Sequence, residues 1–282
     1  MNVPADALGK PIRGPSAFSG DLPRFLALTM HLAAMEFKLR FFGSALGYLW
    51  QLVRPLLLFG VLYVVFTEFV RLNEGVPHFP AVLLTGIVMF TFFADATNTA
   101  VTSVVDRENL VRKIEFPRLV VPFAVVCTAV LNLLANLVAV LVFILASGVE
   151  PRLEWVLALP LIAVLVAFTT GMATLLSALF PRFRDVKPIW EVAGQLLFYA
   201  SPILYAIEVI PNRDFQKLIM LSPIASILQE LRHVVIDPSA PSAAQAIGGG
   251  ELLLIPSAIV VLAITLGIWV FAREAPRIAE EL

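Results

Sequence analysis

Long apolar stretches without one charged residue are the feature that most constrains this chain. Three of them cover residues 119–149, 155–181 and 252–272. About 20 apolar residues in a helix cross the hydrocarbon core of a bilayer, so each stretch predicts a transmembrane helix. Hydrophobic residues make up 59% of the 282 residues and charged residues only 15%, whereas soluble domains have about 25% charged residues. These values exclude a soluble enzyme.

Three further stretches are similarly apolar and carry a few charges. They cover residues 52–70, 81–104 and 189–209, and only Asp95 lies well away from the end of its stretch. Charged groups near a span end reach the interface, whereas a charge in the middle is costly. We therefore expect an all-α integral membrane protein with six transmembrane helices.

The basic residues are distributed unevenly over the predicted loops. With six spans, both termini and two of the loops lie on one side of the membrane, and these segments contain fifteen of the 20 Lys and Arg residues. The loops on the opposite side contain the other five. Lys and Arg are retained in the cytoplasm, so both termini are predicted to be cytoplasmic. Residues 1–23 lack the apolar core of a signal peptide and are expected to form a flexible cytosolic tail, and residues 273–282 are expected to form a cytosolic C-terminal tail.

An amphipathic segment precedes the first span. Phe25, Leu28, Leu32, Met35 and Leu39 recur at spacings of three and four, which places them on one face of a helix. Basic residues border this face, as in helices that lie in the membrane interface. We expect an interfacial helix within residues 24–50, and the alternative is a helix packed on a soluble domain.

A short charged segment, residues 106–117, separates the second and third predicted spans. Six charged residues surround a small apolar face, and Pro117 is expected to end the helix. The segment is too short and too charged to cross a bilayer, which leaves a helix that docks on another protein or a solvated loop. The candidate contact residues are Arg107, Glu108, Leu110, Arg112, Lys113, Ile114 and Phe116.

The outer segment, residues 211–250, contains apolar residues at helical spacing after a Ser-Pro pair, which is typical of a helix start. This helix is too short to cross a bilayer. The pattern predicts a pair of short re-entrant helices that could act as a gate, with an ordinary extracellular loop as the alternative. The candidate gate residues are Ser222, Ile224, Ile227, Leu228 and Leu231.

No motif for catalysis or for phosphate binding occurs in the sequence. It lacks G-x-x-x-x-G-K-[ST], H-E-x-x-H and G-x-S-x-G, and its three histidines are predicted to lie on opposite sides of the membrane. Its single cysteine, Cys127, lies in an apolar run, and the net charge of −1 gives no reason to expect nucleic acid. We expect no catalytic residue and no metal or cofactor in this chain. Uphill transport would then need an ion gradient or a separate ATPase.

Polar residues inside the spans are the candidates for a transport path. Asp95 could carry protons, although a relay normally uses several such groups. Asn132 and Asn136 lie one turn apart, and Tyr199 and Tyr205 could stack on sugar rings. The alternative is that these side chains serve only hydrogen bonding and packing between helices.

Four strings resemble the permease of polysaccharide ABC exporters, the group that exports O-antigen, teichoic acid, capsule and mycobacterial galactan. They are LGYLW at 46–50, ENLVRKIEFPR at 108–118, RFRDV at 182–186 and YASPILY at 199–205. They keep the family's order between about residue 24 and residue 236. Relatives often have Asn-Pro where this chain has Ser222-Pro223.

The resemblance implies a homodimer joined to two copies of a nucleotide-binding subunit, which holds ATP and Mg, in a bacterial inner membrane. Residues 106–117 would be the coupling helix that inserts into the ATPase, and residues 211–250 would gate the outer mouth. The cargo would be a lipid-linked glycan in contact with Asn132, Asn136, Tyr199 and Tyr205. An ABC permease for drugs or lipids, or a proton-coupled transporter that uses Asp95, stays open as an alternative.

Overall fold

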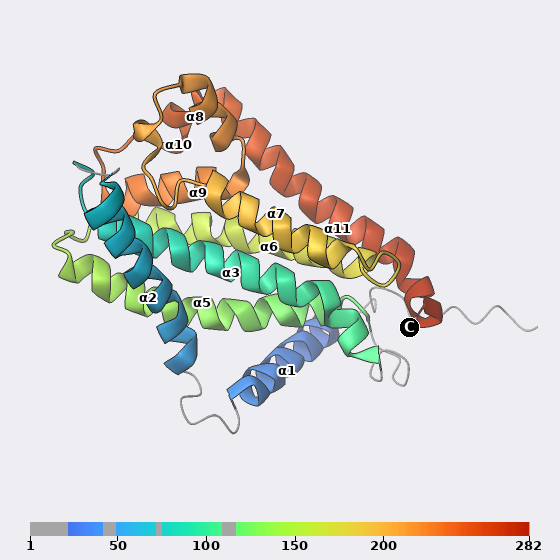
Figure 1. Cartoon of the computed structure of the whole chain (residues 1–282). Coiled ribbons are helices and arrows are strands. Elements are labelled where there is room, and N and C mark those ends of the chain that lie inside the picture. The colour runs from blue at the N-terminus through green and yellow to red at the C-terminus, as the bar shows by residue number, and fades with distance from the viewer. Residues whose placement is uncertain (1–21, 42–48, 72–74, 109–116, 282) are drawn as a thin grey trace, which may run out of the picture.

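The computed structural model describes residues 22–41, 49–71, 75–108 and 117–281, and all regular elements within these ranges are helices (Figure 1). This confirms the all-α prediction. The predicted tail at residues 1–23 lies almost entirely outside the described residues. The elements are α1 (Leu22–Phe41), α2 (Leu49–Val64), η2 (Val65–Val70), α3 (Phe79–Asp106), α5 (Val120–Ala146), η3 (Leu153–Leu157), α6 (Ala158–Leu179), α7 (Val186–Ala200), η4 (Ile207–Val209), α8 (Arg213–Met220), α9 (Pro223–Leu231), η5 (Arg232–Ile236), α10 (Ala243–Ile247), η6 (Gly250–Leu253) and α11 (Leu254–Glu281).

Five stretches of the described chain are long and apolar enough to cross a membrane: residues 49–70, 79–106, 120–146, 153–179 and 250–275. Each contains or nearly coincides with a stretch predicted from the sequence. A sixth span is counted only if α8 and the α9–η5 helix, which are bent by 102° at a short break, are taken as one.

The predicted fifth span, residues 189–209, differs from the structure. Its helix, α7, ends at Ala200, and Ser201 has an extended conformation with ψ of 149°. The cause is Pro202, because proline disfavours helical geometry at the residue before it and has no N–H to donate. The chain then turns inward, so that Ile203 is buried against Gly86 of α3.

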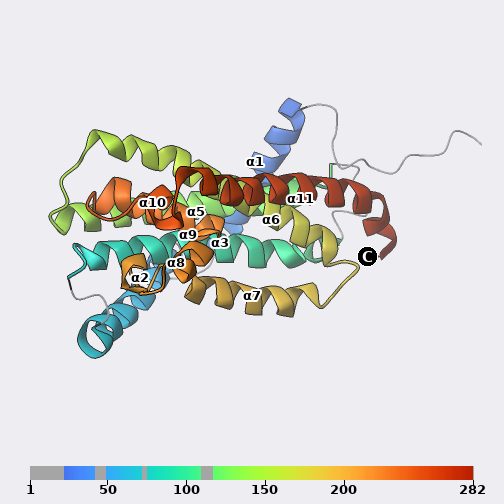
Figure 2. The same cartoon turned by 90° about the horizontal axis from the view of Figure 1, so that it is seen from above.

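Helix α3 is the centre of the molecule. In its most apolar window 78% of the residues are buried, against 6% in the span that begins with α2. Figure 2 shows α3 between α7 and the pair of α5 and α6. A helix buried on most of its circumference needs apolar residues on most of its sides, and the exception on α3 is a narrow polar stripe of Thr91, Asp95 and Thr99.

The two ends of the helix bundle differ in charge. The C-terminal end of α3, the turn between α6 and α7 and the C-terminal part of α11 lie together, and we call this the basic end (Figure 1). It carries Arg107, Arg118, Arg182, Arg184 and Arg273. Helices α8 and α10 and the turn after α5 lie at the opposite end, which we call the distal end.

Two glycines allow α6 and α11 to pack closely. A Cβ atom on Gly171 would lie 2.7 Å from the backbone of Ala263 and Ile264, and a Cβ on Gly267 would overlap the Gly171 carbonyl. Backbone contact of this kind is typical of helices that pack inside membranes. Gly171 belongs to a small-residue face with Ala163 and Ala167.

Helix α1 packs along α5 with part of its apolar face. Phe25 is 3% exposed and meets the ring of Phe123 edge to face at 5.5 Å, and the Thr128 hydroxyl shares its proton between the Ala124 carbonyl of its own helix at 2.9 Å and the Ala33 carbonyl of α1 at 3.3 Å. Met35 and Leu39, which the sequence placed on the same face, are exposed by 52% and 65%. One side of α1 therefore packs on α5 while the other is exposed.

The helix ends can be compared with the ends of the predicted segments. Helix α2 begins at Leu49, within the last two residues of the predicted interfacial segment. Helix α11 continues without a break to Glu281, so the predicted cytosolic tail at residues 273–282 is helical up to this residue. Hydropathy marks where a span leaves the hydrocarbon and not where its helix ends.

Candidate functional site

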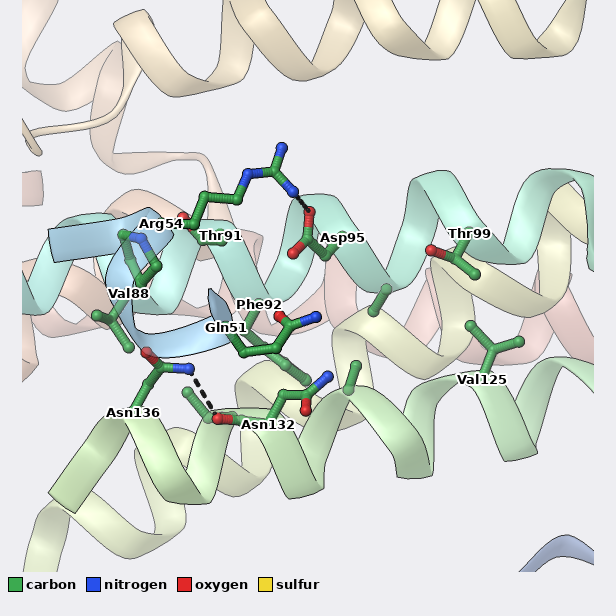
Figure 3. A pocket seen from close by; sticks show the side chains of 14 residues that line it. Gln51, Arg54, Val88, Thr91, Phe92, Asp95, Thr99, Val125, Asn132 and Asn136 are labelled. Carbon is green, nitrogen blue, oxygen red and sulfur yellow. Dashed lines mark hydrogen bonds and ion pairs between the residues drawn. The ribbon is translucent and has the colours of Figure 1, made fainter. Parts of the chain in front are cut away.

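A polar pocket lies between α2, α3 and α5 (Figure 3). About 40 Å³ of its volume is open to water, which is room for roughly three water molecules and none for a sugar ring. The pocket is formed where the first turns of α2 pass across the middle of α3. Its polar side chains are Gln51, Arg54, Thr91, Asp95, Thr99, Asn132 and Asn136.

Arg54 and Asp95 form an ion pair at the edge of this pocket. Arg54 Nη1 lies 4.0 Å from Asp95 Oδ1, and the two side chains are 70% and 41% exposed. Asp95 lies near the middle of the 28-residue helix α3. An exposed charge at such a depth costs roughly 2.5–3.5 kcal/mol in hydrocarbon. The ion pair offsets part of this cost, since each charge has an opposite charge beside it.

The predicted path residues Asn132 and Asn136 both line the pocket. The Asn136 amide donates to the Asn132 carbonyl at 2.9 Å. The Oδ1 atom of Asn132 is buried and accepts no hydrogen bond from any described residue. Gln51 and Arg54 complete the pocket, and the sequence reasoning missed them as path residues. Their signal is the i,i+3 spacing of two polar residues at the start of an apolar helix.

Tyr199 and Tyr205 lie elsewhere, at the C-terminal end of α7. Tyr199 is 66% exposed, and the Tyr205 hydroxyl donates to the Ala200 carbonyl at 3.0 Å. Helix α3 separates them from the pocket, because another of its faces packs on α7. There Phe90 meets Phe198 with ring centroids 5.2 Å apart. The four predicted sugar contacts thus form two separate groups.

The candidate gate residues of α9 lie inside the subunit. Ile224, Ile227, Leu228 and Leu231 are all at most 6% exposed and belong to the same core as α3 and α6. Ser222 occupies the predicted N-cap position, but its side chain makes no capping hydrogen bond. Its carbonyl instead accepts from the Ser226 amide at 3.0 Å.

A buried charge network holds η5 in place at the distal end. Arg232 is 5% exposed; its Nη1 donates to Glu208 Oε2 at 2.8 Å and its Nη2 to Asp237 Oδ2 at 3.4 Å. Asp237 Oδ1 also accepts from the Ser239 amide at 3.1 Å. A buried cation needs such partners. The sequence reasoning missed this network, because the three charges lie in different elements.

Most of the predicted docking segment lies outside the described residues. Its candidate contact residues that are not described are Leu110, Arg112, Lys113, Ile114 and Phe116. Arg107 and Glu108 are described. Arg107 Nη2 forms a close ion pair with Glu36 Oε1 of α1, and its Nη1 donates to the Ser103 carbonyl at 3.0 Å. Its side chain is only 20% exposed. Arg107 therefore ties the end of α3 to α1.

The residues after this segment are buried in the basic end. Arg118 is 2% exposed, and its Nη1 donates to the Ala275 carbonyl of α11. Burial lowers the pKa of the Arg118 guanidinium from its usual range. Around it, Phe25, Leu119 and Phe271 belong to one apolar cluster. The ends of α1, α3, α5, α6 and α11 that meet in this cluster thus form one packed block.

Comparison with known proteins gives consistent matches. Residues 27–236, from α1 to the end of η5, match the ABC-2 type transporter family. An "O-antigen export system permease protein RfbA" of Klebsiella pneumoniae is 32% identical over 203 residues, which cover 72% of this chain and 77% of the relative. A protein of the same name from Myxococcus xanthus is 29% identical over 224 residues, covering 79% and 85%.

Proposed function

Since the chain belongs to the ABC-2 type transporter family, we propose that it is the permease subunit of an ATP-driven exporter that moves a lipid-linked polysaccharide across the membrane. The relatives named as O-antigen export permeases support a polysaccharide as cargo. The observation that carries the proposal is the exposed pair of Arg54 and Asp95 beside the polar pocket. A polar surface at mid-depth of the spans is what a conduit needs and what a lipid-facing surface excludes.

A homodimer supplies the missing wall of this conduit. Helix α2 is nearly uncovered, and α7 contains no buried residue. Both present exposed apolar side chains, including Leu57 and Val61 on α2 and Val192 and Leu196 on α7. A second copy that covers these faces would enclose Arg54 and Asp95 in an aqueous path. Tyr199, exposed on α7, would then face the path as a surface on which sugar rings stack.

Energy is supplied by a partner subunit that binds ATP and Mg. The sequence has no nucleotide-binding loop, and residues 106–117 have the charge and apolar face of a docking helix. The packed block around Phe25 and Arg118 supports this role, because it would pass a push on the docking helix to several spans at once. The excess of arginine at the basic end supports a cytoplasmic position for this end by the positive-inside rule, and the membrane of the proposal is the bacterial inner membrane.

Deletion of the gene tests the cargo. We expect loss of surface polysaccharide, measured by immunoblot of whole-cell glycolipid extracts, with lipid-linked polymer accumulating inside the cell. A plasmid copy should restore export, and deletion of the gene for the proposed ATPase subunit should give the same phenotype. Unchanged surface polysaccharide with increased sensitivity to drugs would contradict the proposal in favour of a drug exporter.

Replacing both Arg54 and Asp95 by neutral residues distinguishes an ATP-driven exporter from a proton-coupled carrier. In the double variant Arg54→Gln/Asp95→Asn both side chains stay polar, so no unpaired charge is left in the path. An ATP-driven exporter should keep most of its transport in proteoliposomes, and a protonophore should have no effect. Loss of transport in this variant together with sensitivity of the wild type to the protonophore would favour a proton-coupled carrier.

A further inference from the structure

A groove opens between α5 and the η3–α6 segment in the distal half of the molecule. Its volume is about 420 Å³, far above that of the polar pocket, and the two share no residue. The floor consists of nearly inaccessible side chains, among them Met89, Ile144 and Leu231. Leu141, Val156 and Leu159 also line it and are 43%, 61% and 68% exposed. Since these three lie in transmembrane stretches, the groove faces hydrocarbon.

Two buried polar atoms of residues that line this groove have no hydrogen-bond partner among the described residues: Thr85 Oγ1 and Trp155 Nε1. Thr85 is only 7% exposed. Other threonines in the spans behave differently, because Thr97, Thr128 and Thr169 donate to the carbonyl four residues earlier at 2.7–2.9 Å. Thr85 lies in the same kind of helix and makes no such bond.

The chemistry of the two atoms and of the walls defines the ligand. An indole N–H is only a donor and needs an acceptor oxygen. A water molecule could supply one, but ordered water needs two to four polar partners and leaves the apolar walls uncovered. A molecule that fits both parts has a long hydrocarbon chain and an ester or phosphate oxygen near its end. Trp residues meet lipid in this way at membrane interfaces.

We propose that the groove between α5 and α6 binds one phospholipid of the surrounding bilayer. One acyl chain lies along Met89 and Ile144, and an ester or phosphate oxygen of the lipid accepts the hydrogen bond of Trp155. The groove opens to the bilayer and not into the polar pocket, which favours a bilayer phospholipid over the lipid carrier of a transported glycan. Leu231 and Val235 also line the groove, so the lipid braces η5 beside the Arg232 network.

Photolabelling of the full-length protein tests this site independently of the transported cargo. The protein is reconstituted in nanodiscs with a small fraction of phosphatidylethanolamine that carries a diazirine on one acyl chain. After irradiation, mass spectrometry should find adducts concentrated on residues 137–144 and 155–162. Trp155→Phe keeps the ring and removes the N–H, so labelling there should fall about fivefold, as expected for one hydrogen bond. Ala158→Phe fills the groove and should abolish labelling.

Trp269→Phe is the matched control, because Trp269 is 57% exposed on α11 and lines none of the pockets described above. It should leave labelling unchanged. Size-exclusion chromatography shows whether each variant is folded. If Ala158→Phe does not fold, Thr85→Val replaces it in the experiment. Labelling that is spread evenly over the exposed faces of α11 and α5, or that Trp155→Phe leaves unchanged in folded protein, would overturn the site. Displacement of the label by polyprenyl phosphate but not by phosphatidylethanolamine would overturn the choice of lipid.

Discussion

Glu36 and Arg107 join α1 to the end of α3, and neutralising either is expected to loosen the basic end of the molecule. Their side chains are 19% and 20% exposed, so the pair is shielded from most of the solvent. Hydrogen bonds to charged groups contribute about 1.5–3 kcal/mol, whereas exposed ion pairs contribute about 0.2–1 kcal/mol. We expect Glu36→Gln to lower the free energy of unfolding by about 2 kcal/mol. For a chain of this size that is a decrease of about 5 °C in Tm.

The assay is thermal unfolding of the purified full-length protein for Glu36→Gln, Arg107→Gln and the double variant. Arg107→Gln should cost somewhat more than Glu36→Gln, because it also removes the hydrogen bond to the Ser103 carbonyl. If the two charges interact, the double variant should be hardly less stable than Arg107→Gln alone. Strictly additive effects would refute the reasoning.

An exposed ion pair at the distal end supplies the control for the unfolding experiment. Arg152 Nη1 lies 3.3 Å from Glu154 Oε2, but the Glu154 side chain is 62% exposed. Glu154→Gln should therefore change the free energy of unfolding by less than about 1 kcal/mol. If the proposed function holds, Glu36→Gln should also lower the amount of polymer exported per ATP hydrolysed. Glu154→Gln, far from the docking segment, should not.

Two further predictions concern the packing of single residues. Gly171→Ala should lower Tm by several degrees, because the added Cβ would lie 2.7 Å from the α11 backbone. Gly194→Ala should leave Tm unchanged or raise it, because no atom lies within 4 Å of the added Cβ. Equal effects of the two variants on Tm would contradict the close approach of α6 and α11. Arg232→Met should destabilise the protein by about 3–5 kcal/mol, because it leaves Glu208 and Asp237 without their cation. Arg213→Met, at an exposed site, should have little effect on thermal unfolding, and a similar loss for both variants would argue against the buried network.

The position of most membrane helices followed from hydropathy, and the exception is instructive. Residues 189–209 are as apolar as a span, yet α7 stops at Ala200 because Pro202 follows. The proline was visible in the sequence, but a proline inside a span can also leave the helix continuous, as Pro55 does in α2. Which outcome occurs depends on the neighbouring helices that satisfy the freed backbone groups.

The candidate site was predicted in part. Asn132 and Asn136 were recognised because polar residues one turn apart in an apolar helix share a face. Arg54 was counted only as a basic residue near a span end, since hydropathy does not give the depth at which α2 crosses α3. The gate residues of α9 were recognised by the spacing of a buried helix face. That spacing is the same whether the face lines an opening or, as observed, packs in the core.

Hydropathy and charge alone were enough to predict a bundle of membrane helices with basic residues at one end. Both properties are local, since twenty apolar residues need lipid and a cluster of arginines needs water wherever the rest of the chain lies. The contacts between residues far apart in the sequence became known only from the packed helices. Arg107 contacts Glu36, which lies 71 positions earlier, and Arg232 contacts Glu208. Such pairings depend on the packing of whole helices, and no local pattern of residues specifies it.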